Sequence, residues 1–223
     1  MPKIENSPSS LSNRQNATVL FADIVGYTRM METNETDALS KLNIFKEKLD
    51  NIISDTSGKV IQYYGDAALV TFDTPIEAMI CAKQLQKKVQ ALNVPLRLGL
   101  HQGEVVYKNN NVFGDTVNIA SRLESMGITG SILLSEKVKD AVDGYQGFQF
   151  TDLGTFSLKN VRHPLKVFAL ADEGLVVPSI SEIERKIAQP KTLFDKPMMK
   201  WGIGALMLVL LLSISSSVYR KAF

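Results

Sequence analysis

Residues 17–28 read ATVLFADIVGYT, and this stretch decides the fold of the chain. Its apolar run is typical of a buried strand, and Asp23 interrupts the run near its end. Burying an unpaired charge is costly, so Asp23 needs a partner, either a metal ion or the nearby backbone that it caps. Gly26 and Thr28 follow where the chain turns helical, and backbone N–H groups at a helix start can face an anion. On this stretch alone the strand-capping interpretation is the simpler one.

A second stretch favours the metal interpretation. Residues 60–72 read VIQYYGDAALVTF, which predicts two apolar strands joined by a tight turn at Tyr64-Gly65-Asp66. By itself Asp66 is an ordinary turn residue. If the hairpin lies beside the first strand, Asp23 and Asp66 converge, and two carboxylates can hold two Mg²⁺ ions for an in-line phosphoryl displacement.

Four motifs occur in order: LFADIVGYT, YYGDAALVTF, LRLGLHQGEVV and VFGDTVNIASRLES. Together they resemble the class III nucleotidyl cyclases, the catalytic domains of adenylate and guanylate cyclases, over residues 17–172. The resemblance implies an α+β fold, an antiparallel-rich sheet with helices packed on it around a ferredoxin-like core. It also implies an enzyme that converts a nucleoside triphosphate, ATP in the first instance, to the 3′,5′-cyclic monophosphate and pyrophosphate, which makes a second messenger.

The resemblance assigns metal and catalytic roles. Asp23, Asp66 and the Ile24 carbonyl correspond to ligands of two Mg²⁺ or Mn²⁺ ions in each site. Asn118 and Arg122 correspond to the residues that orient the ribose and stabilise the transition state at the α-phosphate. They are four residues apart, so they share one helix face. Without the resemblance, an ordinary solvated polar face explains them as well.

The resemblance also implies contacts to the phosphates. They involve the segment that follows the first strand and one loop lysine, although a lone loop lysine is equally typical of an ordinary surface. These residues are Gly26, Tyr27, Thr28 and Lys159.

Two positions that read the base depart from the family pattern. Adenylate cyclases usually carry Lys and then Asp or Thr there, and guanylate cyclases usually carry Glu and Cys, whereas this chain has Gln62 and Asn111. Side-chain amides both donate and accept hydrogen bonds, so the pair suits adenine in one orientation and guanine in the other. We expect ATP, with guanylate or pyrimidine-nucleotide cyclase as the alternatives.

Composition sets limits on class and partners. The chain has 223 residues, of which 45% are hydrophobic and 22% are charged. This composition suits one globular domain with a hydrophobic core, together with further segments outside the domain. A formal net charge of +2 implies no nucleic-acid partner. The single cysteine, Cys81, makes no intrachain disulfide, and His101 and His163 lack the spacing of metal ligands.

The chain divides into five predicted segments. Residues 1–16 predict a disordered tail without a signal peptide, and residues 173–200 a linker in which Ser181 and Glu184 suit a capping box. Trp201 to Tyr219 contains no charged residue and approaches the ~20 residues that span a bilayer, with aromatic residues at both ends. The segments are a tail at 1–16, the catalytic domain at 17–172, a linker at 173–200, a transmembrane helix at 201–219 and a short tail at 220–223. We expect a single-pass C-terminal anchor with the catalytic domain in the cytoplasm, where nucleoside triphosphates are found.

Apolar spacing predicts the other elements, with the helices on one side of the sheet. Helices are expected at 30–57, 74–92, 115–126 and 135–142, and strands at 95–106 and 130–134, with two or three more within 148–172. The resemblance implies a symmetric homodimer, because in this family the metal carboxylates come from one domain and the Asn and Arg from the other. The alternatives are an inactive nucleotide-binding module on a membrane tether and a scaffold that only dimerises.

Overall fold

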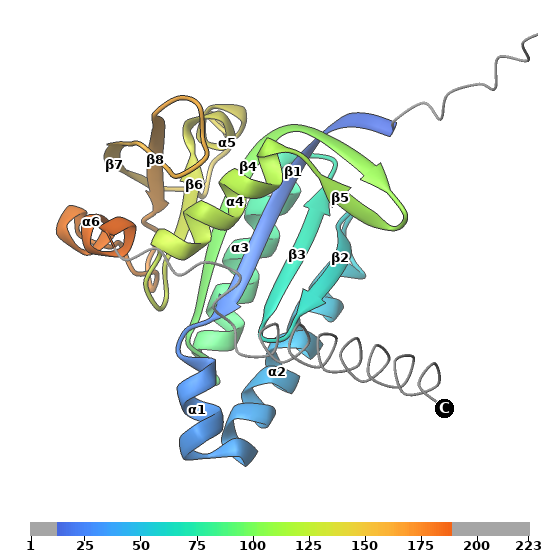
Figure 1. The fold of residues 1–223 in the computed structure, drawn as a ribbon, viewed down its shortest axis with the longest axis vertical. Helices are drawn as coiled ribbons and strands as arrows, with labels where there is room; N and C mark the ends of the chain where they lie inside the picture. The colour runs from blue at the N-terminus through green and yellow to red at the C-terminus, as the bar shows by residue number, and fades with distance from the viewer. Residues whose placement is uncertain (1–12, 189–223) are drawn as a thin grey trace, which may run out of the picture. The chain divides into compact units, whose positions relative to one another are not determined.

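A mixed sheet organises residues 13–188, the part of the chain that the computed structural model describes (Figure 1). The strand order is β2-β3-β1-β4-β6-β8-β7, and β5 pairs with β4. β4 and β6 run parallel, whereas the other paired strands are antiparallel, so the sheet is antiparallel-rich as predicted. The strands are β1 Asn13–Ile24, β2 Lys59–Tyr64, β3 Ala67–Phe72, β4 Leu96–Lys108, β5 Asn111–Phe113, β6 Ile132–Ser135, β7 Phe150–Phe156 and β8 Leu165–Leu170.

Helices cover both faces of the sheet, so the expectation of helices on one side is wrong. The reason lies in β1, whose central apolar residues follow one another without a break. Because successive side chains of a strand point to opposite sides, both faces of β1 are apolar. Leu20 packs in one buried cluster with Phe45 of α2 and Leu85 of α3, whereas Val19 packs in another with Ala120 of α4. The helices are α1 Tyr27–Thr33, α2 Glu35–Ile53, α3 Pro75–Gln90, α4 Asp115–Met126, α5 Glu136–Ala141 and α6 Ile180–Ala188.

The single helix predicted at 30–57 is two helices. Asn34 separates α1 from α2, with φ −156° and ψ 88°, outside the helical region. Its side-chain oxygen accepts a hydrogen bond from the backbone N–H of Asp37 at 3.1 Å, which makes Asn34 the N-cap of α2. Local capping therefore interrupts an apolar pattern that would otherwise read as continuous.

Three consecutive asparagines at residues 109–111 lie at the connection of a hairpin between β4 and β5. Asn109 and Asn110 have positive φ angles of 53° and 58°, as a two-residue β-hairpin turn requires. Asn111 begins β5, a strand of three residues that the sequence does not predict. This hairpin brings β5 close to β2.

Both ends of the described chain are more ordered than predicted. Residues 13–16 continue β1 and pair with β4, instead of belonging to a tail. Within the predicted linker, α6 buries Ile183 in a cluster with Leu123 of α4. Its capping box is Ser179 with Glu182 and not Ser181 with Glu184, because the Ser179 N–H donates to Glu182 at 2.8 Å. The predicted transmembrane helix at 201–219 lies outside the described residues, and within 13–188 every helix is too short or too polar to cross a bilayer.

His101 and Cys81 carry side chains of the kind that enzymes use in catalysis, but both are buried in the core. His101 is buried on β4 with its Nδ1 2.7 Å from Ser135 Oγ, and burial together with Lys137 lowers the pKa of His101 to about 4. Burial in α3 raises the pKa of the Cys81 thiol to about 12. A neutral imidazole and a protonated thiol suit core positions.

Gly99 lets α4 lie directly on β4. A Cβ at this position would be 2.1 Å from the backbone nitrogen of Glu124 and 2.6 Å from the carbonyl oxygen of Ala120, both in α4. At Gly103, a Cβ would instead meet the Thr116 hydroxyl at 2.6 Å, and a side chain can turn away. The close approach of strand and helix therefore depends on Gly99.

We predict that Gly99→Ala destabilises the fold by about 3 kcal/mol or more, because the helix backbone must move to accept the methyl group. Gly103→Ala is the matched control and should cost less. Urea unfolding of both variants measures the difference. A Gly103→Ala variant that is destabilised as much as Gly99→Ala would contradict this account of the helix contact.

Candidate functional site

Two aspartates lie close together at one end of the central strands, which we name the carboxylate edge. Asp23 lies near the end of β1, and Asp66 lies in the β2–β3 turn. β1 and β3 are antiparallel with Asp23 opposite Ala67, and the Ile24 N–H donates to the Asp66 carbonyl oxygen at 3.2 Å. The pairing of these strands therefore brings together the three predicted metal-binding residues.

The predicted phosphate segment lies beside this edge. Gly26, with φ 76°, is the N-cap residue of α1, which Tyr27 begins. Burial, the Asp66 charge and the Glu35 charge raise the pKa of Tyr27, so its phenol lies within electrostatic reach of Asp66. Gly26, Tyr27 and Thr28 thus follow closely on the end of β1 that carries Asp23.

Asn118 and Arg122 share one face of α4. Asn118 is exposed and Arg122 half-buried, whereas Ala120, Leu123 and Glu124 are buried on the opposite face. The helix therefore packs its apolar face on the sheet and presents Asn118 and Arg122 away from it.

The predicted base-reading pair lies on two strands that approach each other. Gln62 is exposed on β2, and Asn111 begins β5 with its side-chain oxygen accepting from the Val112 N–H at 2.8 Å. Lys159 is exposed in the turn between β7 and β8, and β7 lies at the opposite end of the strand order from β2. One chain therefore brings Gln62 and Asn111 near each other but keeps Lys159 apart from them.

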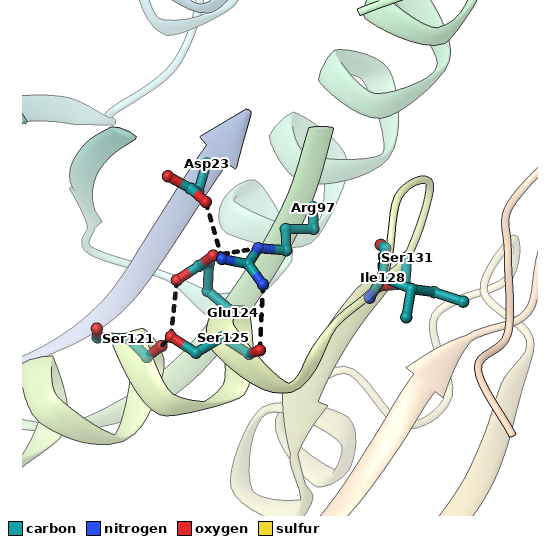
Figure 2. Close-up of polar contacts among 7 residues, drawn as sticks. All are labelled: Asp23, Arg97, Ser121, Glu124, Ser125, Ile128 and Ser131. Atoms are coloured by element: carbon teal, nitrogen blue, oxygen red, sulfur yellow. Dashed lines mark hydrogen bonds and ion pairs between the residues drawn. The ribbon is translucent and has the colours of Figure 1, made fainter. Parts of the chain in front are cut away.

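Arg97 joins the carboxylate edge to α4, and sequence reasoning missed it (Figure 2). It lies on β4 directly opposite Asp23 on β1, and its Nη2 donates to Asp23 Oδ2 at 2.8 Å. Its Nη1 donates to the Ser125 carbonyl at 3.1 Å, and its Nε lies 2.5 Å from Glu124 Oε1. The Nε contact is a charge pair without the alignment of a regular hydrogen bond.

The three charges depend on one another. Burial alone would lower the pKa of Arg97, but the Glu124 and Asp23 carboxylates raise it above its ordinary value, so Arg97 is charged. Burial raises the pKa of Glu124, Arg97 opposes that shift, and the Asp23 charge adds to it. The sequence did contain a sign of this ion pair, because two charged residues stand at apolar positions. Arg97 interrupts an apolar strand, and Glu124 lies on the buried face of α4.

The donor set at the carboxylate edge fits Mg²⁺ or Mn²⁺. Both ions prefer oxygen ligands, and Mg²⁺ typically takes one or two carboxylates together with substrate phosphates. Within residues 13–188, no group of three or more His, Cys, Asp or Glu side chains is placed to hold a metal.

The chain belongs to the class III adenylate and guanylate cyclase family. The sequence model of the family described as "Adenylate and Guanylate cyclase catalytic domain" matches residues 10–172. This agrees with the mixed sheet, its covering helices and the carboxylate edge.

Some of the relatives are named adenylate cyclases and others guanylate cyclases. A protein of Rhizobium meliloti (strain 1021) with an adenylate cyclase name is 32% identical over 164 residues, and "Receptor-type guanylate cyclase gcy-23" of Caenorhabditis elegans is 32% identical over 168 residues. These matches cover 70% and 64% of this chain but only 28% and 16% of the relatives. The crystal structure of an "Adenylate/Guanylate Cyclase/Hydrolase" from Silicibacter pomeroyi is 32% identical, with a TM-score of 0.68 over 73% of this chain and 99% of that one.

Proposed function

We propose that the chain is a nucleotidyl cyclase that converts a nucleoside triphosphate to the 3′,5′-cyclic monophosphate and pyrophosphate, with ATP as the proposed substrate. The observation that carries this proposal is the meeting of Asp23 and Asp66 at the carboxylate edge, in a chain whose α4 presents Asn118 and Arg122 on one face. An inactive module would not need both the carboxylate pair and the Asn–Arg pair.

The reaction is an in-line displacement at the α-phosphorus. The ribose 3′-hydroxyl gives up its proton to solvent and its oxygen forms the new bond to phosphorus, the bond to the bridging oxygen of the β-phosphate breaks, and pyrophosphate leaves. Mg²⁺ or Mn²⁺ held by Asp23, Asp66 and the Ile24 carbonyl would supply a lowered pKa for the 3′-hydroxyl and neutralisation of developing charge. Arg122 stabilises the negative charge of the pentavalent phosphate, and Asn118 orients the ribose.

A two-fold homodimer would complete each site. Asn118 and Arg122 lie on the face of α4 turned away from the sheet, which suits delivery to a partner subunit. Phe113 on β5 is 51% exposed, which suits an apolar contact between subunits. Gly26, Tyr27, Thr28 and Lys159 would contact the phosphates. Residues 201–219 would anchor the protein in a membrane with the catalytic domain in the cytoplasm.

We predict that Asp23→Ala and Asp66→Ala each lower cyclic-nucleotide production by at least about a hundredfold, because loss of a metal ligand removes several kcal/mol of transition-state stabilisation. Turnover of all four triphosphates with Mg²⁺ or Mn²⁺ is the measurement. The control is Asp73→Ala, because Asp73 is exposed and follows the opposite end of β3 from Asp66. Near wild-type turnover with ordinary metal dependence in either variant would contradict the metal role.

We predict that Asp23→Ala and Arg122→Ala complement each other when the two chains are co-expressed. Each homodimer lacks the same element at both sites, whereas a mixed dimer has one site with both defects and one intact site. Random pairing makes half of the dimers mixed, so recovery should approach roughly a quarter of wild-type activity under two-fold symmetry. Cyclic product is compared with each variant alone, and no recovery despite confirmed mixed dimers would place both residues in one chain's site.

We predict that Gln62→Lys combined with Asn111→Asp raises the preference for ATP over GTP by about tenfold. The lysine only donates and the aspartate only accepts, which suits N1 and the N6 amine of adenine. The ratio of kcat/KM values for the two nucleotides measures the change. An unchanged or reversed ratio would show that these positions do not read the base.

A further inference from the structure

Arg97 has its three nitrogen atoms engaged at once, and two of them are engaged by α4. Nε faces Glu124 and Nη1 donates to the Ser125 carbonyl, while Nη2 reaches Asp23 (Figure 2). The side chains of Arg97, Asp23 and Glu124 are only 13%, 15% and 8% exposed. Because a guanidinium is planar and rigid, the two contacts to α4 determine the direction in which Nη2 points.

This geometry differs from that of a second ion pair with a buried carboxylate, between Lys83 and Asp172. Lys83 of α3 pairs with Asp172, whose other oxygen accepts from the Gln149 N–H at 2.7 Å. That pair joins α3 to the segment after β8 and includes neither of the two aspartates of the carboxylate edge. A flexible lysine there stabilises the fold without orienting a carboxylate for a ligand, so Lys83 is a matched control for ion-pair loss.

We propose that Arg97, held in place by Glu124 and the Ser125 carbonyl, is a positioning residue that fixes the Asp23 carboxylate for the divalent cation. The inference rests on the proposed function, because it takes Asp23 as a metal ligand. A carboxylate has two oxygens and about four acceptor sites, so one can hold both an arginine and a metal ion. Groups that orient metal ligands in this way typically change metal affinity or activity by about 10–100-fold when they are mutated.

The sign of the effect separates positioning from simple electrostatics. If Arg97 acted only as a nearby positive charge, its removal would tighten cation binding, because a repelling charge would be gone. If Arg97 orients Asp23, its removal weakens cation binding. A role in stability alone would lower the fraction of folded protein and leave the affinity of the folded fraction unchanged.

The experiment measures Mn²⁺ binding directly in the full-length chain. Free Mn²⁺ is followed by electron paramagnetic resonance during titration in the presence of 3′-deoxy-ATP, which lacks the attacking hydroxyl. The proteins are wild type, Asp23→Ala, Arg97→Met, Arg97→Lys, Glu124→Gln and the control Lys83→Met. Thermal unfolding of each protein reports the stability cost separately.

We predict that Arg97→Met weakens Mn²⁺ binding by about 10–100-fold. Arg97→Lys keeps the charge but loses the planar set of N–H donors, so its Mn²⁺ affinity should lie between those of Arg97→Met and wild type. Glu124→Gln should weaken binding in the same direction, and Lys83→Met should bind as wild type does whatever its stability. In turnover, excess Mn²⁺ should restore most of the kcat of Arg97→Lys. If Arg97→Met does not fold, Arg97→Lys decides.

Wild-type or tighter Mn²⁺ affinity in the folded Arg97 variants overturns the positioning role. If Asp23→Ala has lost Mn²⁺ while those variants keep it, only the positioning role fails. If Asp23→Ala also binds Mn²⁺ as wild type does, the metal site of the proposed function fails with it.

Discussion

One buried guanidinium, that of Arg97, joins the carboxylate edge of the sheet to α4. Arg97 lies between Asp23 of β1 and Glu124 of α4, and each of the three side chains is at most 15% exposed. Loss of the arginine would leave two carboxylates side by side in a region where unpaired charge is costly. The end of β1 and the last turn of α4 must therefore stay within ion-pair distance, and Gly99 allows the close approach that this distance requires.

The same contact joins two groups of residues with different proposed roles. α4 carries Asn118 and Arg122 on its outer face, while its inner face supplies Glu124 to Arg97. In the proposed two-fold dimer, Asp23 and Arg122 of one chain belong to different sites. A displacement of α4 would then act on the metal-binding edge of one site and on the transition-state residues of the other. The α6 contact through Ile183 adds a further constraint on the same helix.

Much of the fold is encoded in short patterns, and these were readable from the sequence. The apolar run before Asp23, the turn at Gly65 and the spacing of Asn118 and Arg122 each involve neighbouring residues, so they predicted β1, the β2–β3 hairpin and the shared face of α4. Two of the failures were also local, because capping and turn chemistry overrode apolar spacing. Asn34 divides one predicted helix into two, and the turn at Asn109 starts a hairpin that adds β5.

The sequence by itself determined the family, the order of the main elements and the proximity of Asp23 and Asp66, because motif order and apolar period are properties of the chain. Only the tertiary structure decided that helices cover both faces of the sheet and that α6 packs on α4. It also decided that Arg97 bonds to Asp23, 74 residues away along the chain. No local pattern specifies such a contact, because it exists only once β1 has paired with β4 and α4 has packed across that pair.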